Sequence, residues 1–196
     1  MLDHVFTDAI GAIRDAFEAA LLERQAFEER FNTDVLLGDT SWATSYGLPG
    51  EGSPPRVQAD VTMVWPTWAQ TAYRSWYIGE EIDEPPRITI ELVFRIQRLM
   101  ERPEPKDVLA SLPMESPSVG TDVLLRDAVT VEAIYDADYT EAGWAIEASY
   151  AGEYEVREEV LADGAELDAH FSGLGGWISS VLVRLGDVRP DYRPAE

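Results

Sequence analysis

An alternating stretch near the middle of the chain constrains the fold more than any other feature of the sequence. Between Arg87 and Leu99, apolar residues at even positions from Ile88 to Ile96 alternate with mostly polar residues. A period of two, rich in β-branched and aromatic residues, is typical of a strand with one buried face. Prolines precede the stretch at 85–86 and follow it at 103, so we expect one long strand here.

Two neighbouring stretches complete the predicted centre of the sheet. Residues 57–65 also alternate and predict a second strand. Residues 68–78 fit either a strand or a helix that stacks Trp68 and Trp76 on one side. Their residue types and the short connection favour a strand, which makes an antiparallel meander with 57–65 and 87–99. A helix over 68–78 is the alternative.

Helical spacing marks both ends of the chain. An apolar stripe beginning with Phe6 and Ile10 predicts a helix over His4–Arg30, capped by Asp3, which covers the sheet. Residues 167–185 also show helical spacing, although three glycines between 173 and 176 weaken a continuous helix. A strand over 177–185 is the alternative for the second half of this segment.

Shorter elements and loops fill the remainder of the chain. Glycine and proline clusters separate weaker apolar runs, which predict short elements. We expect strands at Asp34–Leu37, Val123–Tyr135 and from Trp144 towards Val156, and one short helix at Pro105–Leu112. The predicted irregular segments are a loop or arm at 38–55, a linker at 113–121 and an extended C-terminal tail at 187–196.

This order of elements predicts the fold class. Connections between strands are of the hairpin type, and no strand–helix–strand alternation appears. We therefore predict an α+β fold with a mainly antiparallel sheet of about five to seven strands, backed by an N-terminal amphipathic helix and a C-terminal helix. At 196 residues the chain is expected to form one domain, 1–196.

The charge of the chain limits its partners. Thirty-seven acidic residues face fifteen basic ones, giving a formal net charge of −22. A field of that sign repels phosphate backbones and anionic lipid surfaces, so we expect no nucleic-acid binding and no membrane binding. The acidic residues are spread along the chain, which favours adaptation to molar salt, where self-repulsion is screened. Mimicry of nucleic acid and an ordinary acidic protein are the alternatives.

Residues that could act in catalysis or bind a metal are either few or not arranged in a recognisable pattern. The chain has no cysteine, and its two histidines, His4 and His170, lack metal-ligand spacing. Asp136, Asp138 and Glu141 do not satisfy the pattern of a calcium-binding loop. No G-x-S-x-G or complete dinucleotide-binding pattern is present. We therefore predict no catalytic residue, no metal site and no cofactor.

Aromatic residues are the best candidates for a binding surface. They are densest between 65 and 77, where they serve either as core or as anchors of protein–protein contacts. Further aromatic residues lie on the predicted arm at 38–55, and two charged residues lie on the polar side of strand 87–99. The predicted interface residues are Trp42, Tyr46, Trp65, Trp68, Tyr73, Trp76, Tyr77, Glu91 and Arg95.

These observations predict a non-enzymatic structural or assembly subunit from a salt-adapted source. It would bind other protein subunits in a homo-oligomer or larger particle, and small connector proteins of tailed-virus necks and tails are similar in size and general character. One alternative is an acidic chaperone or nucleic-acid mimic with a basic protein partner; another is a carboxylate-based hydrolase. The N-terminus lacks the pattern of a signal peptide, so we expect the cytoplasm or a virion.

Overall fold

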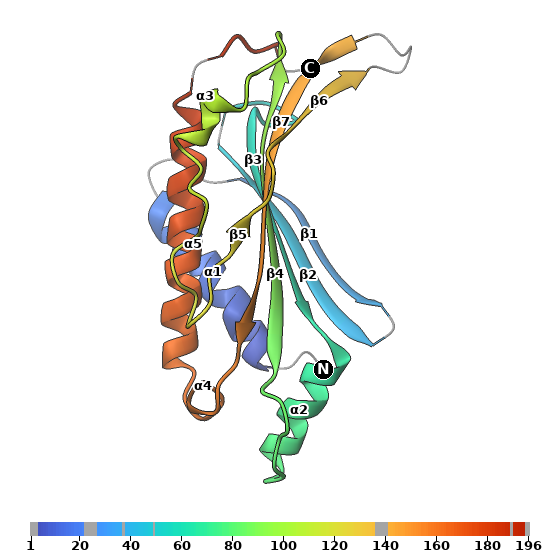
Figure 1. Cartoon of the computed structure of the whole chain (residues 1–196), viewed down its shortest axis with the longest axis vertical. Coiled ribbons are helices and arrows are strands. Elements are labelled where there is room, and N and C mark those ends of the chain that lie inside the picture. The colour runs from blue at the N-terminus through green and yellow to red at the C-terminus, as the bar shows by residue number, and fades with distance from the viewer. Residues whose placement is uncertain are drawn as a thin grey trace.

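A computed structural model describes residues 4–21, 27–36, 38–48, 50–135, 141–188 and 190–194. Twelve elements follow one another along the chain (Figure 1). They are α1 (His4–Leu21), β1 (Phe27–Leu36), β2 (Asp39–Gly47), β3 (Val57–Trp65), α2 (Thr67–Tyr77), β4 (Arg87–Leu99), α3 (Lys106–Leu109), β5 (Leu125–Arg126), β6 (Thr130–Tyr135), β7 (Glu141–Glu155), α4 (Glu158–Ala162) and α5 (Ala165–Gly186).

All described strands join one antiparallel sheet. Its order is β1-β2-β3-β4-β7, and both β5 and β6 pair with the outer edge of β7. The long strand that the alternation predicts is β4, which lies between β3 and β7. The predicted α+β fold, with an antiparallel sheet and a helix near each end of the chain, is confirmed.

The core lies between the sheet and two helices on one of its faces (Figure 1). On β4, the residues at even positions from Ile88 to Ile96 are at most 3% exposed. The Phe6 ring of α1 stacks on Trp65 at 6.3 Å, and Trp177 of α5 meets the edge of Phe94 at 6.0 Å. Full burial of a large apolar side chain such as Phe6 or Phe94 stabilises the fold by about 1.5–3 kcal/mol.

One of the three glycines that weakened the predicted C-terminal helix, Gly175, allows close packing of α5. A Cβ atom on Gly175 would lie 2.9 Å from the Cβ of Ala16 and 3.0 Å from the carbonyl oxygen of Ile13. Glycine therefore lets α1 and α5 approach each other. Helix α5 is continuous over Ala165–Gly186, so the alternative strand at 177–185 is wrong.

The predicted strand at 68–78 is also wrong, because this segment is helix α2. Ala69, Gln70 and Tyr73 form its buried face at helical spacing. The side-chain amide nitrogen of Gln70 donates a hydrogen bond to the backbone carbonyl of Trp65 at 2.9 Å, which fixes the start of the helix against β3. Strands β3 and β4 pair directly with each other, so the predicted meander does not form.

Two predicted boundaries in the first half of the chain are corrected. The N-terminal helix ends at Leu21 rather than Arg30, and strand β1 begins at Phe27 and includes most of the predicted strand at 34–37. The predicted arm at 38–55 is mainly strand β2, with an irregular loop remaining at 50–56. Serine and threonine residues in β2 dilute the apolar signal, although its even-numbered residues are buried.

The second half keeps its predicted order with altered lengths. The predicted strand at 123–135 is divided into β5 and β6, whereas the strand from Trp144 extends over all of β7. The short helix is confined to Lys106–Leu109. In the tail, Tyr192 pairs with Leu99. Asp3, Asp136 and Asp138 lie outside the described residues.

Candidate protein interface

Four of the predicted interface residues belong to the core. Trp42 and Trp65 are 0% exposed, Tyr46 is 4% exposed and Tyr73 is 7% exposed. Trp42 and Tyr46 point to the helix-covered side of β2, in the same alternation as its other buried residues. A partner cannot reach these rings in the folded protein, so they stabilise the sheet and its helices.

The exposed aromatic residues among the predicted interface residues lie on α2, which projects beyond the end of the sheet (Figure 1). Tyr77 is 72% exposed and the adjacent Ile78 is 69% exposed, whereas Trp76 is partly buried. We call residues 76–82 the α2 tip. Trp68, 43% exposed, lies at the other end of the same helix.

The α2 tip is supported by a buried tyrosine. The Tyr73 ring lies 6.1 Å from Trp76 and 6.3 Å from Tyr77, measured between ring centroids. The Tyr73 hydroxyl shares a hydrogen bond of 2.9 Å with Nδ1 of His4, at the start of α1. The aromatic rings of the tip are therefore fixed to a second helix, which lowers the entropy that they lose on binding.

A cleft of about 470 Å³ lies beside the tip. It is bounded by Trp76 and Ile82 and by three carboxylates, those of Glu80, Glu81 and Glu158. Gly79, with φ +82°, turns the chain from α2 into this cleft. Among the described residues, no cation lies within ion-pair distance of these three carboxylates. The tip thus combines exposed apolar side chains with unneutralised negative charge.

The sheet face opposite the helices offers a different surface. Arg95 forms an ion pair there with Glu147, its partner in the register between β4 and β7. Asp60 accepts hydrogen bonds from Ser45 and Gln58, and Glu91 is exposed. In the polar cavity on this face, about 430 Å³, the charged groups of Arg95 and Asp60 are therefore engaged in an ion pair and in hydrogen bonds, and the lining has no exposed aromatic residue.

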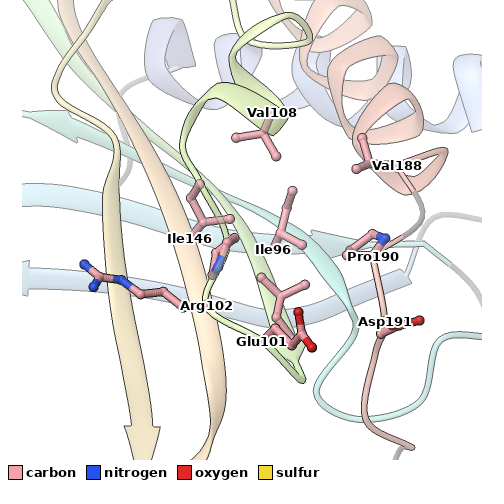
Figure 2. Close-up of a pocket in the computed structure, with 10 residues that line it drawn as sticks. Ile96, Glu101, Arg102, Val108, Ile146, Val188, Pro190 and Asp191 are labelled. Carbon is pink, nitrogen blue, oxygen red and sulfur yellow. The ribbon is translucent and has the colours of Figure 1, made fainter.

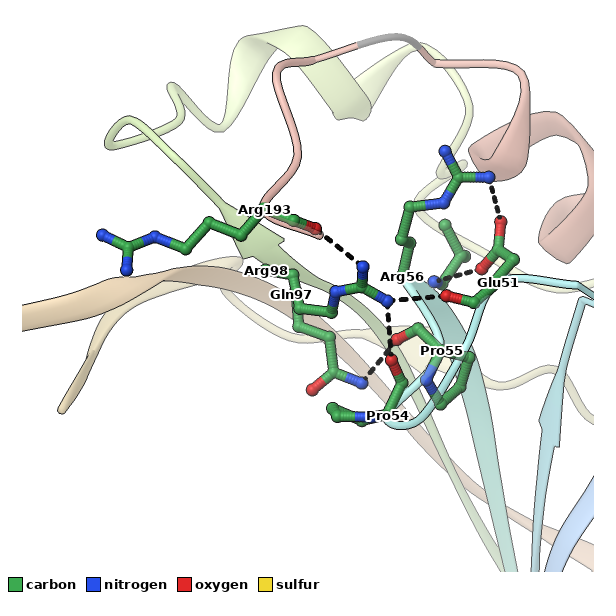
Figure 3. A network of polar contacts seen from close by, with 8 residues as sticks. Glu51, Pro54, Pro55, Arg56, Gln97, Arg98 and Arg193 are labelled. Atoms are coloured by element: carbon green, nitrogen blue, oxygen red, sulfur yellow. Dashed lines mark hydrogen bonds and ion pairs between the residues drawn. The ribbon is translucent and has the colours of Figure 1, made fainter. Parts of the chain in front are cut away.

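The other end of the sheet is closed by a polar network (Figure 3). Arg98 lies in a bulge of β4 with φ +64°, and its guanidinium donates to the carbonyls of Glu51, Pro54 and Arg193 at 2.6, 3.1 and 2.7 Å. This joins loop 50–56 and the C-terminal tail to β4. We call this region the clamped end.

A buried glutamate completes the network. Glu51 is 7% exposed, and its carboxylate accepts hydrogen bonds from the Arg56 guanidinium and the Val57 amide, both at 3.0 Å. The guanidinium of Arg56 also lies 4.9 Å from the ring centre of Tyr192. Burial raises the pKa of the Tyr192 hydroxyl above its ordinary value. The network holds loop 50–56 and the C-terminal tail on β4.

A pocket of about 310 Å³ opens beside the clamped end, between β4, β7, α3 and the segment after α5 (Figure 2). Its apolar lining includes Ile96, Val108, Ile146, Val188 and Pro190, and Glu101 and Asp191 lie on its rim. In Figure 2 the side chain of Arg102 extends away from the pocket, and its guanidinium lies 5.5 Å from the ring centre of Trp144.

Both histidines are hydrogen-bonded to tyrosines. His4 pairs with Tyr73, and Nδ1 of His170 lies 3.1 Å from the hydroxyl of Tyr154. Burial raises the pKa of Tyr154 to about 12. Within the described part of the chain, no three histidine, aspartate or glutamate side chains are grouped so that they could hold a metal ion.

Sequence reasoning placed Trp76 and Tyr77 in an interface and missed the rest of the tip. Glu80 and Glu81 follow the helix directly, but acidic residues are too frequent in this chain for that spacing to stand out. Glu158 comes from α4 and joins them only through the fold. Arg98 and Glu51 carried no sequence signal, since a bulge in β4 brings them together.

Comparisons with known proteins assign no function to these surfaces. The chain matches no protein-family model, no curated protein and no solved structure. Among the described helices, none is both long enough and apolar enough to cross a bilayer.

Proposed function

We propose that the protein is a non-enzymatic assembly subunit of a larger protein particle and that it contacts other subunits through the α2 tip. One example of such a subunit is a connector protein in the neck or tail of a virus. The observation that carries the proposal is the exposure of Tyr77 and Ile78, 72% and 69%, on a rigidly supported helix end.

Exposed aromatic residues on a rigid support suit a protein contact. Tyrosine and tryptophan are enriched among residues that dominate the binding energy of protein interfaces. Tyr77 loses little freedom on binding because Tyr73 already packs against it. The neighbouring Ile78 adds apolar surface that becomes favourable to bury only when a partner covers it.

The charge of the chain supports a salt-adapted source. Two copies with a net charge of −22 repel each other over long distances at low salt. At molar salt the Debye length falls to roughly 3 Å, so this repulsion is screened, whereas short contacts within an interface are screened much less. We therefore propose a homo-oligomer that forms in concentrated salt.

Sedimentation in KCl tests the proposal. We expect the wild-type chain to be larger than a monomer at about 2 M KCl and to dissociate as salt is removed. The variant Tyr77→Ser/Ile78→Ser should remain monomeric at both salt concentrations. A monomeric wild type at every salt concentration would contradict the assembly function.

A matched pair of substitutions provides the control. Met114 and Leu125 are 61% and 56% exposed, and they lie beside the middle of β7 rather than at the tip. We expect Met114→Ser/Leu125→Ser to associate like the wild type. An equal loss of self-association in both double variants would mean that general surface hydrophobicity, and not the tip, drives association.

An acidic chaperone or nucleic-acid mimic is the second candidate, and the carboxylates of the tip cleft, which have no cationic partner among the described residues, favour it. Such a protein would bind a basic protein with 1:1 stoichiometry, and added salt would dissolve the complex. The assembly subunit has the opposite salt dependence, so the same sedimentation series separates the two candidates.

A further inference from the structure

The two ends of the molecule have complementary shapes. The α2 tip presents the exposed side chains of Tyr77 and Ile78. The opposite end of the sheet carries the apolar pocket of about 310 Å³ (Figure 2). Because a cavity of about 150 Å³ can hold a benzene molecule, this pocket has room for one large side chain.

The two ends also differ in charge, because exposed arginines lie at the pocket end and none belongs to the α2 tip. The tip and the cleft beside it carry the carboxylates of Glu80, Glu81 and Glu158, without a described cationic partner. At the other end, Arg102 belongs to the pocket lining, although its exposed side chain extends away from the pocket (Figure 2). Arg193 is also exposed and follows the lining residue Asp191 by two positions. No carboxylate among the described residues pairs with either arginine. A guanidinium can pair with a carboxylate and can also stack on an aromatic ring.

The positions of these surfaces decide the symmetry of the contact. The tip follows β3 and precedes the first residue of β4, whereas the pocket includes the last residues of β4. A single molecule cannot bring its own tip into its own pocket, because the length of β4 separates them (Figure 1). A second copy of the chain can supply the tip, and its own pocket then stays open for a third copy.

We propose that copies of this chain associate head to tail, with the α2 tip of one copy seated in the pocket beside the clamped end of the next. The inference rests on the proposed assembly function and specifies its contact. Tyr77 or Ile78 enters the apolar pocket, and the tip carboxylates face Arg102 and Arg193 of the neighbour. Such a heterologous contact builds a closed ring or a filament.

The rim of the pocket explains why salt is required. Glu101 and Asp191 lie on it and oppose the approach of the acidic tip. Screening in concentrated salt weakens this repulsion together with the repulsion between whole molecules. Burial of the apolar side chains does not depend on charge and remains favourable.

Two complementary variants test the head-to-tail contact. The tip variant is Tyr77→Ser/Ile78→Ser, and the pocket variant is Arg102→Glu/Arg193→Glu, which changes exposed side chains only. At about 2 M KCl we expect each variant alone to remain monomeric. Mixed in equal amounts, they should form a complex of one copy each, because one intact tip and one intact pocket remain.

A third variant checks the pocket without changing surface charge. Val188→Trp fills the pocket from the partly buried segment after α5. We expect the dissociation constant of self-association of this variant to rise by at least about tenfold. Its intact tip should still bind the pocket of a wild-type copy. Circular dichroism establishes that each variant is folded.

The outcomes separate the contact from the assembly function. Monomers in the mixture, from variants that are each monomeric alone, would overturn the head-to-tail contact, because one intact tip and one intact pocket would then fail to associate. Oligomers of the pocket variant alone would overturn it as well, while the assembly function would stand. A monomeric wild type would overturn the assembly function itself.

Discussion

The two ends of the sheet differ in how their chain segments are held and in how much of them faces solvent. At the clamped end, loop 50–56, the bulge of β4 and the C-terminal tail are joined by Arg98 and by the buried carboxylate of Glu51. At the α2 tip, the chain leaves the sheet as a helix whose last residues face solvent. The contrast suggests that polar contacts at the first end maintain the fold, whereas the second end is available for a partner.

The largest effect on folding is expected at the clamped end. Arg98→Ala removes three hydrogen bonds from a charged donor and leaves their carbonyl acceptors unpaired, so the free energy of unfolding should fall by about 2–4 kcal/mol. Denaturation with guanidinium chloride measures this change. A loss below about 0.5 kcal/mol would show that the network is incidental.

A companion variant separates backbone strain from hydrogen bonding at the same position. Arg98 has φ +64°, a conformation that glycine adopts more readily than alanine. Arg98→Gly should therefore be about 1 kcal/mol more stable than Arg98→Ala. Equal stability of the two variants would assign the whole loss to the guanidinium.

An intermediate effect is expected where the tip is supported. Tyr73→Phe removes the hydroxyl that pairs with His4 and should lower the free energy of unfolding by about 1 kcal/mol. Tyr154→Phe, which removes the equivalent contact with His170, serves as the control. We expect both variants to lose similar stability, and only Tyr73→Phe to weaken self-association. Equal self-association of the two variants would show that the hydrogen bond between Tyr73 and His4 is not needed for the contact through the tip.

The smallest effect on folding is expected at the tip itself. Tyr77→Ser/Ile78→Ser changes side chains that are mostly exposed, so the free energy of unfolding should stay within about 0.5 kcal/mol of the wild type. Denaturation of the monomer at low salt measures this. A larger loss of unfolding free energy would show that these side chains contribute to the core, and it would contradict the difference between the two ends.

The sequence allowed the centre of the fold to be predicted, because β3 and β4 alternate strictly and have one buried face. It failed at 68–78, where aromatic residues satisfy both periods and only the burial of Ala69, Gln70 and Tyr73 selects a helix. It failed again at β2, whose hydroxyl-bearing residues obscure a buried strand.

For a related reason, the sequence allowed only the aromatic residues of the candidate site to be predicted. Trp76 and Tyr77 stand out as aromatic residues, but Trp65 and Trp42 stand out equally and are buried. Aromatic content alone does not reveal which rings face solvent. The cleft beside the tip needs Glu158 from a distant element, and the pocket needs residues from β4, β7 and the tail. Such surfaces come from tertiary structure.

Cross-linking offers the most direct test of the head-to-tail contact. The chain has no cysteine, so a single substitution in each of two variants labels one end of each copy. With Ile78→Cys marking the tip and Pro190→Cys marking the pocket, mild oxidation of the mixture at about 2 M KCl should give a covalent dimer of one copy of each. Disulfide-linked dimers of the Ile78→Cys variant with itself, or no cross-link between the two variants, would contradict the account.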